Sequence, residues 1–204
     1  MDRSLPSGLQ DTFLWSSHRG MGVHTRPAML YGGEYFAHYQ KLDATQMGGL
    51  LTQARIDLVK KYVNPAEVLD IGIGGGRFVE ESGGYGFDVC ADAVQWLREN
   101  KVYRDPYFSW PAMCCWDSLE HIPDPEKLLA CVKEWLFVSL PTCETESEWL
   151  NSKHMKPGEH LHYWSIQGFV LWCQEQGFEC YEINQAETEL GREGITSFAF
   201  KRVA

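Results

Sequence analysis

Helical spacing of apolar residues is clearest in the stretch that precedes residue 64. The residues at this spacing are Leu51, Ala54, Leu58, Val59 and Tyr62. The pattern places them on one face of a helix, and the Asn64-Pro65 pair that follows is of a kind that ends helices. We therefore expect a helix here that packs its apolar face on a core.

Short apolar runs follow this helix, and they predict buried strands. The runs cover residues 68–71, 85–89, 112–116, 136–140, 178–184 and 195–201. Helical segments are expected between them, at residues 77–82, 91–100, 125–135 and 165–177. Strands that alternate with helices in this way are typical of an α/β fold with a mostly parallel sheet.

The beginning of the chain lacks this periodicity. Residues 1–33 carry glycine, serine, proline and isolated aromatics, so we expect an irregular arm. Tyr35, Phe36 and Tyr39 then share one side of a short helix. This aromatic element is either a lid over a ligand or a patch that caps the core. We thus expect an arm with a lid-like element over residues 1–45 and one domain over residues 46–204.

Three glycines follow the first predicted strand, and they indicate a tight turn that approaches a ligand closely. Gly72, Gly74 and Gly76 are spaced G-x-G-x-G, and Arg77 stands where the third glycine of a dinucleotide-binding turn would fall. No Gly-Lys pair occurs, so a Walker loop is absent. Asp70, two residues before the first glycine, suits a cationic ligand better than a phosphate.

Three motifs in this order resemble the class I S-adenosylmethionine-dependent methyltransferases. The motifs are residues 67–76, residues 84–89, which end in Asp88-Val89, and residues 117–125, which contain Leu119-Glu120-His121. They are similar to the small-molecule (type 23) subgroup related to ubiquinone-biosynthesis enzymes. The resemblance implies a Rossmann-like methyltransferase sheet, mostly parallel with one antiparallel strand near the C-terminus and helices on both faces.

The segment between residues 100 and 111 departs from the family pattern. It is short for the third strand and its loop, so we expect a shortened third-strand region. Asp105 could be the acidic residue that contacts adenine in relatives, although an Asp before Pro is more often part of a turn. The glycine-rich turn that relatives often place before the fifth strand is also missing.

The resemblance implies S-adenosylmethionine as the cofactor and assigns residues to it. Asp70 would help to hold its cationic end, and Asp88 would accept hydrogen bonds from the ribose hydroxyls. The glycines would let the backbone approach, and Trp116 and Asp117 would lie beside the methionine portion. The residues so assigned are Asp70, Gly72, Gly74, Gly76, Asp88, Trp116 and Asp117.

Methyl transfer to a hydroxyl requires a general base, and histidine is suited to this role near neutral pH. His121, His160 and His162 compete for it, and each could instead be a structural histidine. Tyr35, Tyr39 and Glu120 are the residues that we expect beside the acceptor.

The sequence also offers candidate ligands for a metal site. It would use His154, Glu159, His160 and His162. The i, i+2 spacing of the last two histidines is not a common ligand signature, and no Cys-x-x-Cys pair supports it. From the sequence we therefore predict no metal.

Composition narrows the function classes. The 204 residues suit one domain, and the formal charge of −10 disfavours duplex nucleic acid as a partner. No apolar run approaches the ~20 residues of a membrane span, and the N-terminus lacks a signal-peptide core, so we expect a cytoplasmic protein. The seven cysteines include no Cys-x-x-Cys pair and indicate reduced thiols.

Three functions are consistent with these observations. The first is a methyltransferase that modifies a small-molecule or nucleotide-like acceptor. The second is a degenerate methyltransferase fold that binds a ligand or partner without turnover, which the shortened third-strand region would favour. The third is a nicotinamide-dependent oxidoreductase, which the glycine spacing and the absence of a Tyr-x-x-x-Lys pair weaken. The intact motifs favour the first.

Overall fold

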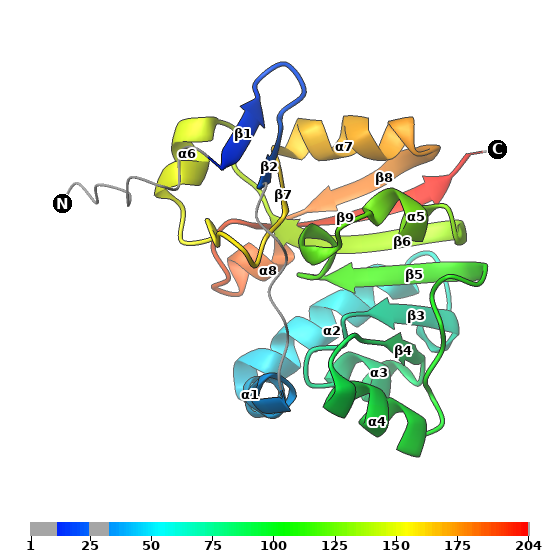
Figure 1. Cartoon of the computed structure of the whole chain (residues 1–204). Coiled ribbons are helices and arrows are strands. Elements are labelled where there is room, and N and C mark those ends of the chain that lie inside the picture. The colour runs from blue at the N-terminus through cyan, green and yellow to red at the C-terminus, as the bar shows by residue number, and fades with distance from the viewer. Residues whose placement is uncertain (1–11, 25–32, 204) are drawn as a thin grey trace.

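A six-stranded sheet organises the computed structural model, which describes residues 12–24 and 33–203 (Figure 1). The strand order is β4-β3-β5-β6-β9-β8. In chain order the strands are β3 (Val68–Ile71), β4 (Tyr85–Phe87), β5 (Trp110–Trp116), β6 (Val132–Pro141), β8 (Phe178–Asn184) and β9 (Ile195–Arg202). β3 is parallel to β4 and β5, and β5 is parallel to β6, whereas β9 is antiparallel to both of its neighbours. The predicted sheet with one antiparallel strand is confirmed.

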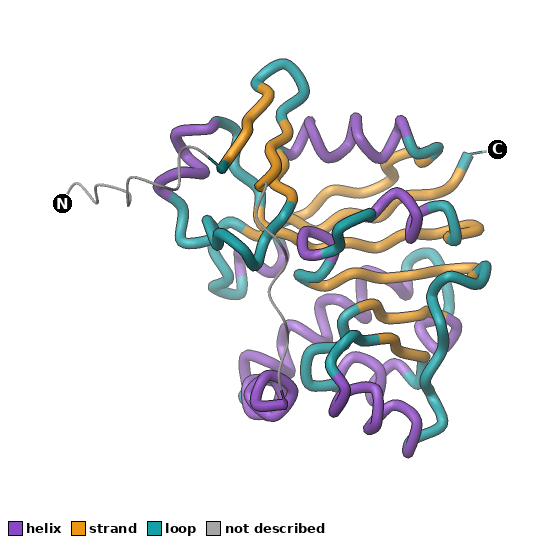
Figure 2. Tube along the Cα trace, viewed as in Figure 1, coloured by secondary structure: helices purple, strands orange, loops and turns teal. Residues whose placement is uncertain are grey.

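Helices cover both faces of this sheet (Figure 2). They are α1 (Gly33–Asp43), α2 (Gln46–Lys60), α3 (Arg77–Ser82), α4 (Ala91–Glu99), α5 (Pro125–Leu129), α6 (Glu146–Asn151), α7 (Ile166–Glu175) and α8 (Ala186–Glu189). Side chains that alternate along β5 enter two separate cores. Met113 and Cys115 pack with residues of α5 and α7, whereas Cys114 and Trp116 pack with residues of α2 and α3. Burial on both faces explains why β5 has an almost continuous apolar sequence.

The third-strand region is as short as predicted. A single bridge between Gly86 and Tyr103 stands at the outer edge of β4. Asp105 accepts a hydrogen bond from the backbone N–H of Tyr107 at 2.9 Å, which is the geometry of a turn residue. This side chain is therefore already used in a local turn.

The beginning of the described chain is not irregular, and this part of the prediction was wrong. β1 (Phe13–Ser16) and β2 (Met21–His24) form an antiparallel hairpin, and β2 also pairs with β7 (His162–Trp164). This three-stranded sheet and α1 lie on the side of the molecule toward which the parallel strands point (Figure 1). The hairpin is stabilised by a partner far along the chain, which local sequence does not indicate. The rest of the predicted arm, residues 1–11 and 25–32, lies outside the described residues.

Two other segments differ from the prediction. The expected helix over residues 125–135 ends at Leu129, and Val132 and Trp135 belong to β6, which pairs with β5 on one side and β9 on the other. The connection over residues 142–161 is not wholly irregular, because Thr145 caps the short helix α6. Within the described residues, no helix is long and apolar enough to cross a membrane.

Candidate cofactor and acceptor site

The glycine turn joins β3 to α3 and has the backbone that the sequence predicts. Gly72, Gly74 and Gly76 have φ angles of +76°, +58° and +93°, a region that other residues enter only with strain. Space is also restricted, since a Cβ on Gly76 would lie 2.8 Å from the Trp96 ring and a Cβ on Gly72 would lie 2.7 Å from the Ser118 Cβ. The turn therefore requires glycine for its conformation and for its packing.

Asp88 follows β4 and lies beside this turn. Its two carboxylate oxygens accept hydrogen bonds from the backbone N–H groups of Ile73, at 3.0 Å, and Cys90, at 2.8 Å. Burial raises the pKa of the Asp88 carboxyl, and these hydrogen bonds oppose the shift. A carboxylate can accept about four hydrogen bonds, so Asp88 can still accept one from a ligand hydroxyl.

Asp70 lies in the centre of β3 and is 1% exposed. Its described hydrogen-bond partner is the Cys114 thiol, which donates at 3.4 Å from the neighbouring strand. Burial raises the pKa of Asp70 to about 8. A carboxyl in this setting favours a nearby cation, because a positive charge offsets the cost of ionising it.

The aromatic side of α1 lies against the glycine turn. The Tyr39 ring comes within 3.4 Å of the position that a Cβ on Gly74 would occupy, and the Tyr35 and Tyr39 ring centroids are 4.6 Å apart. Phe36 points into a core cluster with Ile73. The structure thus brings Tyr39 to the glycine turn and Tyr35 beside Tyr39, on an element anchored by Phe36.

Trp116 ends β5 and Asp117 follows it, and both side chains contact other parts of the protein. The Trp116 ring packs on the Phe78 ring, with 5.4 Å between the ring centroids. The Arg55 guanidinium lies 5.4 Å from the centroid of the Trp116 ring. Asp117 has a φ of +53°, and its carboxylate pairs with Arg55 at 3.2 Å and with Arg192. Both arginines also pair with Glu187, which is 1% exposed. We call Arg55, Asp117, Glu187 and Arg192 the arginine network.

Glu120, His121 and His160 come together beyond the end of β5. Glu120 and His121 belong to a 3-10 turn, Leu119–His121, and His160 precedes β7. The His121 Nε2 lies 3.8 Å from the Glu120 Oε1, and the two imidazole centroids are 4.7 Å apart. Burial raises the pKa of Glu120 well above its ordinary value and lowers the pKa of both histidines, that of His160 to about 2. We call these residues the Glu120–histidine cluster.

The other histidines singled out in the sequence lie apart from this cluster. The His162 Nε2 hydrogen-bonds the Ile122 carbonyl oxygen at 3.0 Å, and the His154 Nε2 hydrogen-bonds the Glu193 carbonyl oxygen at 2.9 Å. The four residues considered as a metal set from the sequence therefore do not converge as a group. In the described residues, the group that converges is Glu120, His121 and His160. In the sequence, the feature that pointed to this cluster was the adjacent Glu120-His121 pair after a strand.

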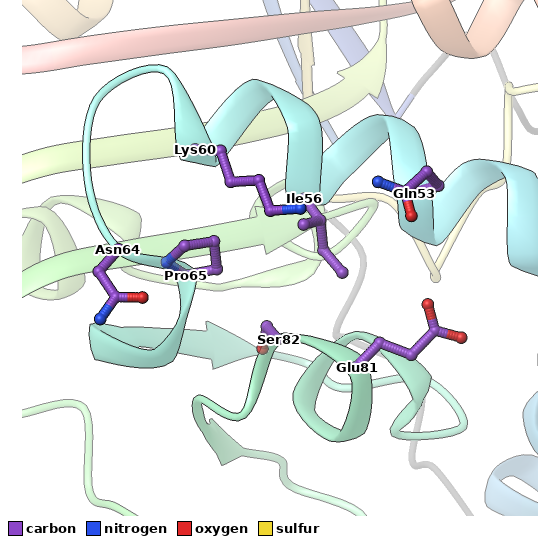
Figure 3. A pocket seen from close by; sticks show the side chains of 7 residues that line it. All are labelled: Gln53, Ile56, Lys60, Asn64, Pro65, Glu81 and Ser82. Atoms are coloured by element: carbon purple, nitrogen blue, oxygen red, sulfur yellow. The ribbon is translucent and has the colours of Figure 1, made fainter.

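A shallow pocket between α2 and α3 lies elsewhere (Figure 3). It is lined by Gln53, Ile56, Lys60, Asn64, Pro65, Glu81 and Ser82. Pro65 precedes β3, and Ser82 ends α3, so the pocket is at the amino end of β3, opposite the glycine turn. It contains none of the predicted site residues.

Several solved structures with this fold are methyltransferases. The magnesium protoporphyrin IX methyltransferase from Synechocystis PCC 6803, solved with bound SAH, is 14% identical, with a TM-score of 0.62 over 84% of this chain and 95% of that chain. S-adenosylmethionine-dependent methyltransferases from Thermotoga maritima and Aquifex aeolicus are each 14% identical with TM-scores of 0.58. They cover 83% and 82% of this chain and 97% and 98% of their own. At these identities the likeness shows the fold.

The fold and the glycine turn thus define a class I methyltransferase of the S-adenosylmethionine-dependent type. The sequence matches the methyltransferase-domain family over residues 38–183, more than half of the chain. The protein belongs to this family. No protein of curated function matches the sequence significantly.

Proposed function

We propose that the protein is an active enzyme that transfers a methyl group from S-adenosylmethionine to a small-molecule acceptor. The observation that carries this proposal is the convergence of three features at the carboxyl ends of β3 and β4. These are the glycine turn, the buried Asp70 and the Asp88 carboxylate. The acceptor assignment is further supported by the neighbour that modifies magnesium protoporphyrin IX, which is itself a small molecule.

The residues of the turn fit the cofactor in chemical terms. Asp88 is positioned by backbone N–H groups and keeps hydrogen-bond acceptor capacity, which suits a ribose hydroxyl. Asp70 is a buried carboxyl that a cationic group would stabilise in its ionised form. The three glycines adopt a left-handed backbone conformation and place no side chain between the turn and a ligand.

The reaction needs alignment more than it needs reactive side chains. A lone pair of the acceptor attacks the methyl carbon, the carbon–sulfur bond breaks, and S-adenosylhomocysteine leaves with a neutral sulfur. An acceptor that carries a proton on the attacking atom releases it to water or to a nearby base. Correct positioning of two bound reactants contributes roughly 7–11 kcal/mol to such a step. Tyr35 and Tyr39 on one side and Glu120 on the other would border the acceptor.

Replacing Asp88 with alanine should weaken S-adenosylmethionine binding by tenfold or more, about 1.4 kcal/mol. The variant loses the carboxylate that is predicted to accept hydrogen bonds from the ribose. Calorimetric titration of the purified protein measures the change. Asp88→Asn serves as the variant with less risk to folding, since its amide oxygen still accepts from one backbone N–H.

Asp92→Ala is the matched control, because Asp92 is an exposed acid in the first turn of α4, four residues away. It should bind the cofactor like the wild type. Equal affinities for the wild type and both Asp88 variants would contradict the assignment of Asp88. A folded wild type that does not bind S-adenosylmethionine would contradict the proposed activity as a whole.

A further inference from the structure

The Glu120–histidine cluster contains three groups with lone pairs that converge from two segments of the chain. One ligand atom from each of Glu120, His121 and His160 lies within 4.8 Å of the others. Glu120 and His160 are 1% and 3% exposed. His121 and His160 are 39 residues apart in the sequence, so the fold itself assembles the cluster.

Several of these lone pairs have no hydrogen-bond partner in the described part of the chain. They are both carboxylate oxygens of Glu120 and the Nδ1 of His160. Buried polar groups in proteins are nearly always hydrogen-bonded, because leaving one without a partner is costly. A cation between the three side chains would satisfy these atoms together.

We propose that Glu120, His121 and His160 bind a divalent first-row transition-metal ion of the zinc or iron(II) type. Two imidazole nitrogens and one carboxylate oxygen form a recognised ligand set for these ions, with positions left for water or substrate. Mg²⁺ and Ca²⁺ prefer sites built from oxygen alone. Ligand atoms about 2.0–2.2 Å from a tetrahedral ion lie roughly 3.4 Å apart, close to the 3.8 Å between His121 Nε2 and Glu120 Oε1.

Backbone contacts hold the two segments of this site together. The Leu161 N–H donates to the Glu120 carbonyl oxygen at 2.8 Å, and the Tyr163 hydroxyl donates to the His160 carbonyl oxygen at 3.2 Å. The His121 ring also hydrogen-bonds the backbone of Glu159. A second hydrogen bond of this kind orients metal-binding histidines in known sites.

The metal site changes the role of the histidines at the acceptor side. The sequence predicted that one of them acts as a general base, whereas in this site His121 and His160 are ligands. The cluster follows β5 directly, and Ser118, two residues before Glu120, hydrogen-bonds the Ile71 carbonyl next to the glycine turn. If the proposed function is correct, the metal lies on the acceptor side of the cofactor.

The test is a metal titration of the untagged, chelator-treated full chain with Co²⁺ and Zn²⁺. We expect one Co²⁺ per chain with a micromolar or lower Kd, a visible absorption spectrum typical of nitrogen and oxygen ligands, and displacement by Zn²⁺ but not by Mg²⁺. His121→Ala and Glu120→Gln should each weaken binding at least tenfold. Melting curves with and without metal show whether each variant is folded. If the histidine variant is not folded, binding by Glu120→Gln decides the test.

His154→Gln is the matched control, because this histidine lies on the same loop as His160 but outside the cluster. It should bind the metal like the wild type. Absence of stoichiometric binding, binding that the cluster variants leave unchanged, or equal loss in His154→Gln would overturn the proposal. S-adenosylmethionine titrations of the same samples separate this outcome from a failure of the proposed activity.

Discussion

Replacing Arg55 with alanine should lower the free energy of unfolding by about 3–5 kcal/mol, because it leaves two acids, Asp117 and the buried Glu187, to share the single counter-charge of Arg192. Arg55 donates from α2 to Glu187 in α8 at 2.7 Å and to Asp117 at 3.2 Å. The Glu187 side chain is 1% exposed, so water does not replace the lost partner. Urea unfolding of the wild type and the variant at pH 7 measures the difference.

Lys60→Ala provides the control on the same helix. Its side chain and that of its partner Asp57 are 56% and 60% exposed, at 3.9 Å, so we expect a loss of at most about 0.5 kcal/mol. A double variant, Arg55→Met with Glu187→Gln, should recover part of the Arg55 loss, because it leaves Arg192 paired with Asp117. A loss below about 1 kcal/mol in Arg55→Ala would contradict this account.

The arginine network also matters for the site. Asp117 combines a φ of +53° with a position directly after β5, three residues before Glu120. Its carboxylate is tied to two arginines from distant segments, which fixes the point where the chain leaves the sheet. The network therefore positions the turn that carries Glu120 and His121.

Local sequence was sufficient for the parts of the fold whose cause is local. The predicted boundaries of α3 coincide with those observed, because Gly76 and Gly83 both adopt the left-handed conformation at its ends. The glycine turn was predictable for the same reason. The expected cofactor came from the family resemblance that three ordered motifs carry, which no single motif would have supported.

Other parts depend on contacts between distant segments, which spacing along the chain does not encode. Val132 and Trp135 fit a helical spacing as well as a strand, and pairing of β6 with strands on both sides decided between them. The small sheet needs β7 as a partner for β2. The Glu120–histidine cluster likewise exists only because Leu161 hydrogen-bonds Glu120 and so places His160 beside His121.

Asp70 should make the cofactor-free protein less stable as pH rises toward 8, and Asp70→Asn should remove this contribution. Burial raises the pKa of Asp70 from about 3.8 to about 8. Below about pH 4 the carboxyl is protonated in both states. Between about pH 4 and 8 the unfolded chain loses the proton while the folded chain keeps it, so this group's stabilisation declines across that window and levels off above it.

Urea unfolding at pH 5 and pH 8 tests this directly. Asp70→Asn should gain on the order of 2–3 kcal/mol over the wild type at pH 8, and clearly less at pH 5, because one pKa unit corresponds to about 1.4 kcal/mol. Glu120, whose pKa is also raised, titrates in both proteins and cancels from the comparison, whereas the repulsion between Asp88 and an ionised Asp70 is part of the measured difference. An equal difference between the two proteins at both pH values would contradict the burial of an ionisable Asp70.

S-adenosylmethionine should reverse this balance, since its positive charges favour the ionised Asp70. Binding to the wild type should then release a proton and tighten between pH 6 and 8 by up to tenfold per pH unit. Asp70→Asn should bind more weakly and with little pH dependence. Calorimetry in two buffers of different ionisation enthalpy counts the released proton. A gain in stability together with a loss of affinity in the same variant would show that Asp70 is retained for the cofactor at the expense of the empty fold.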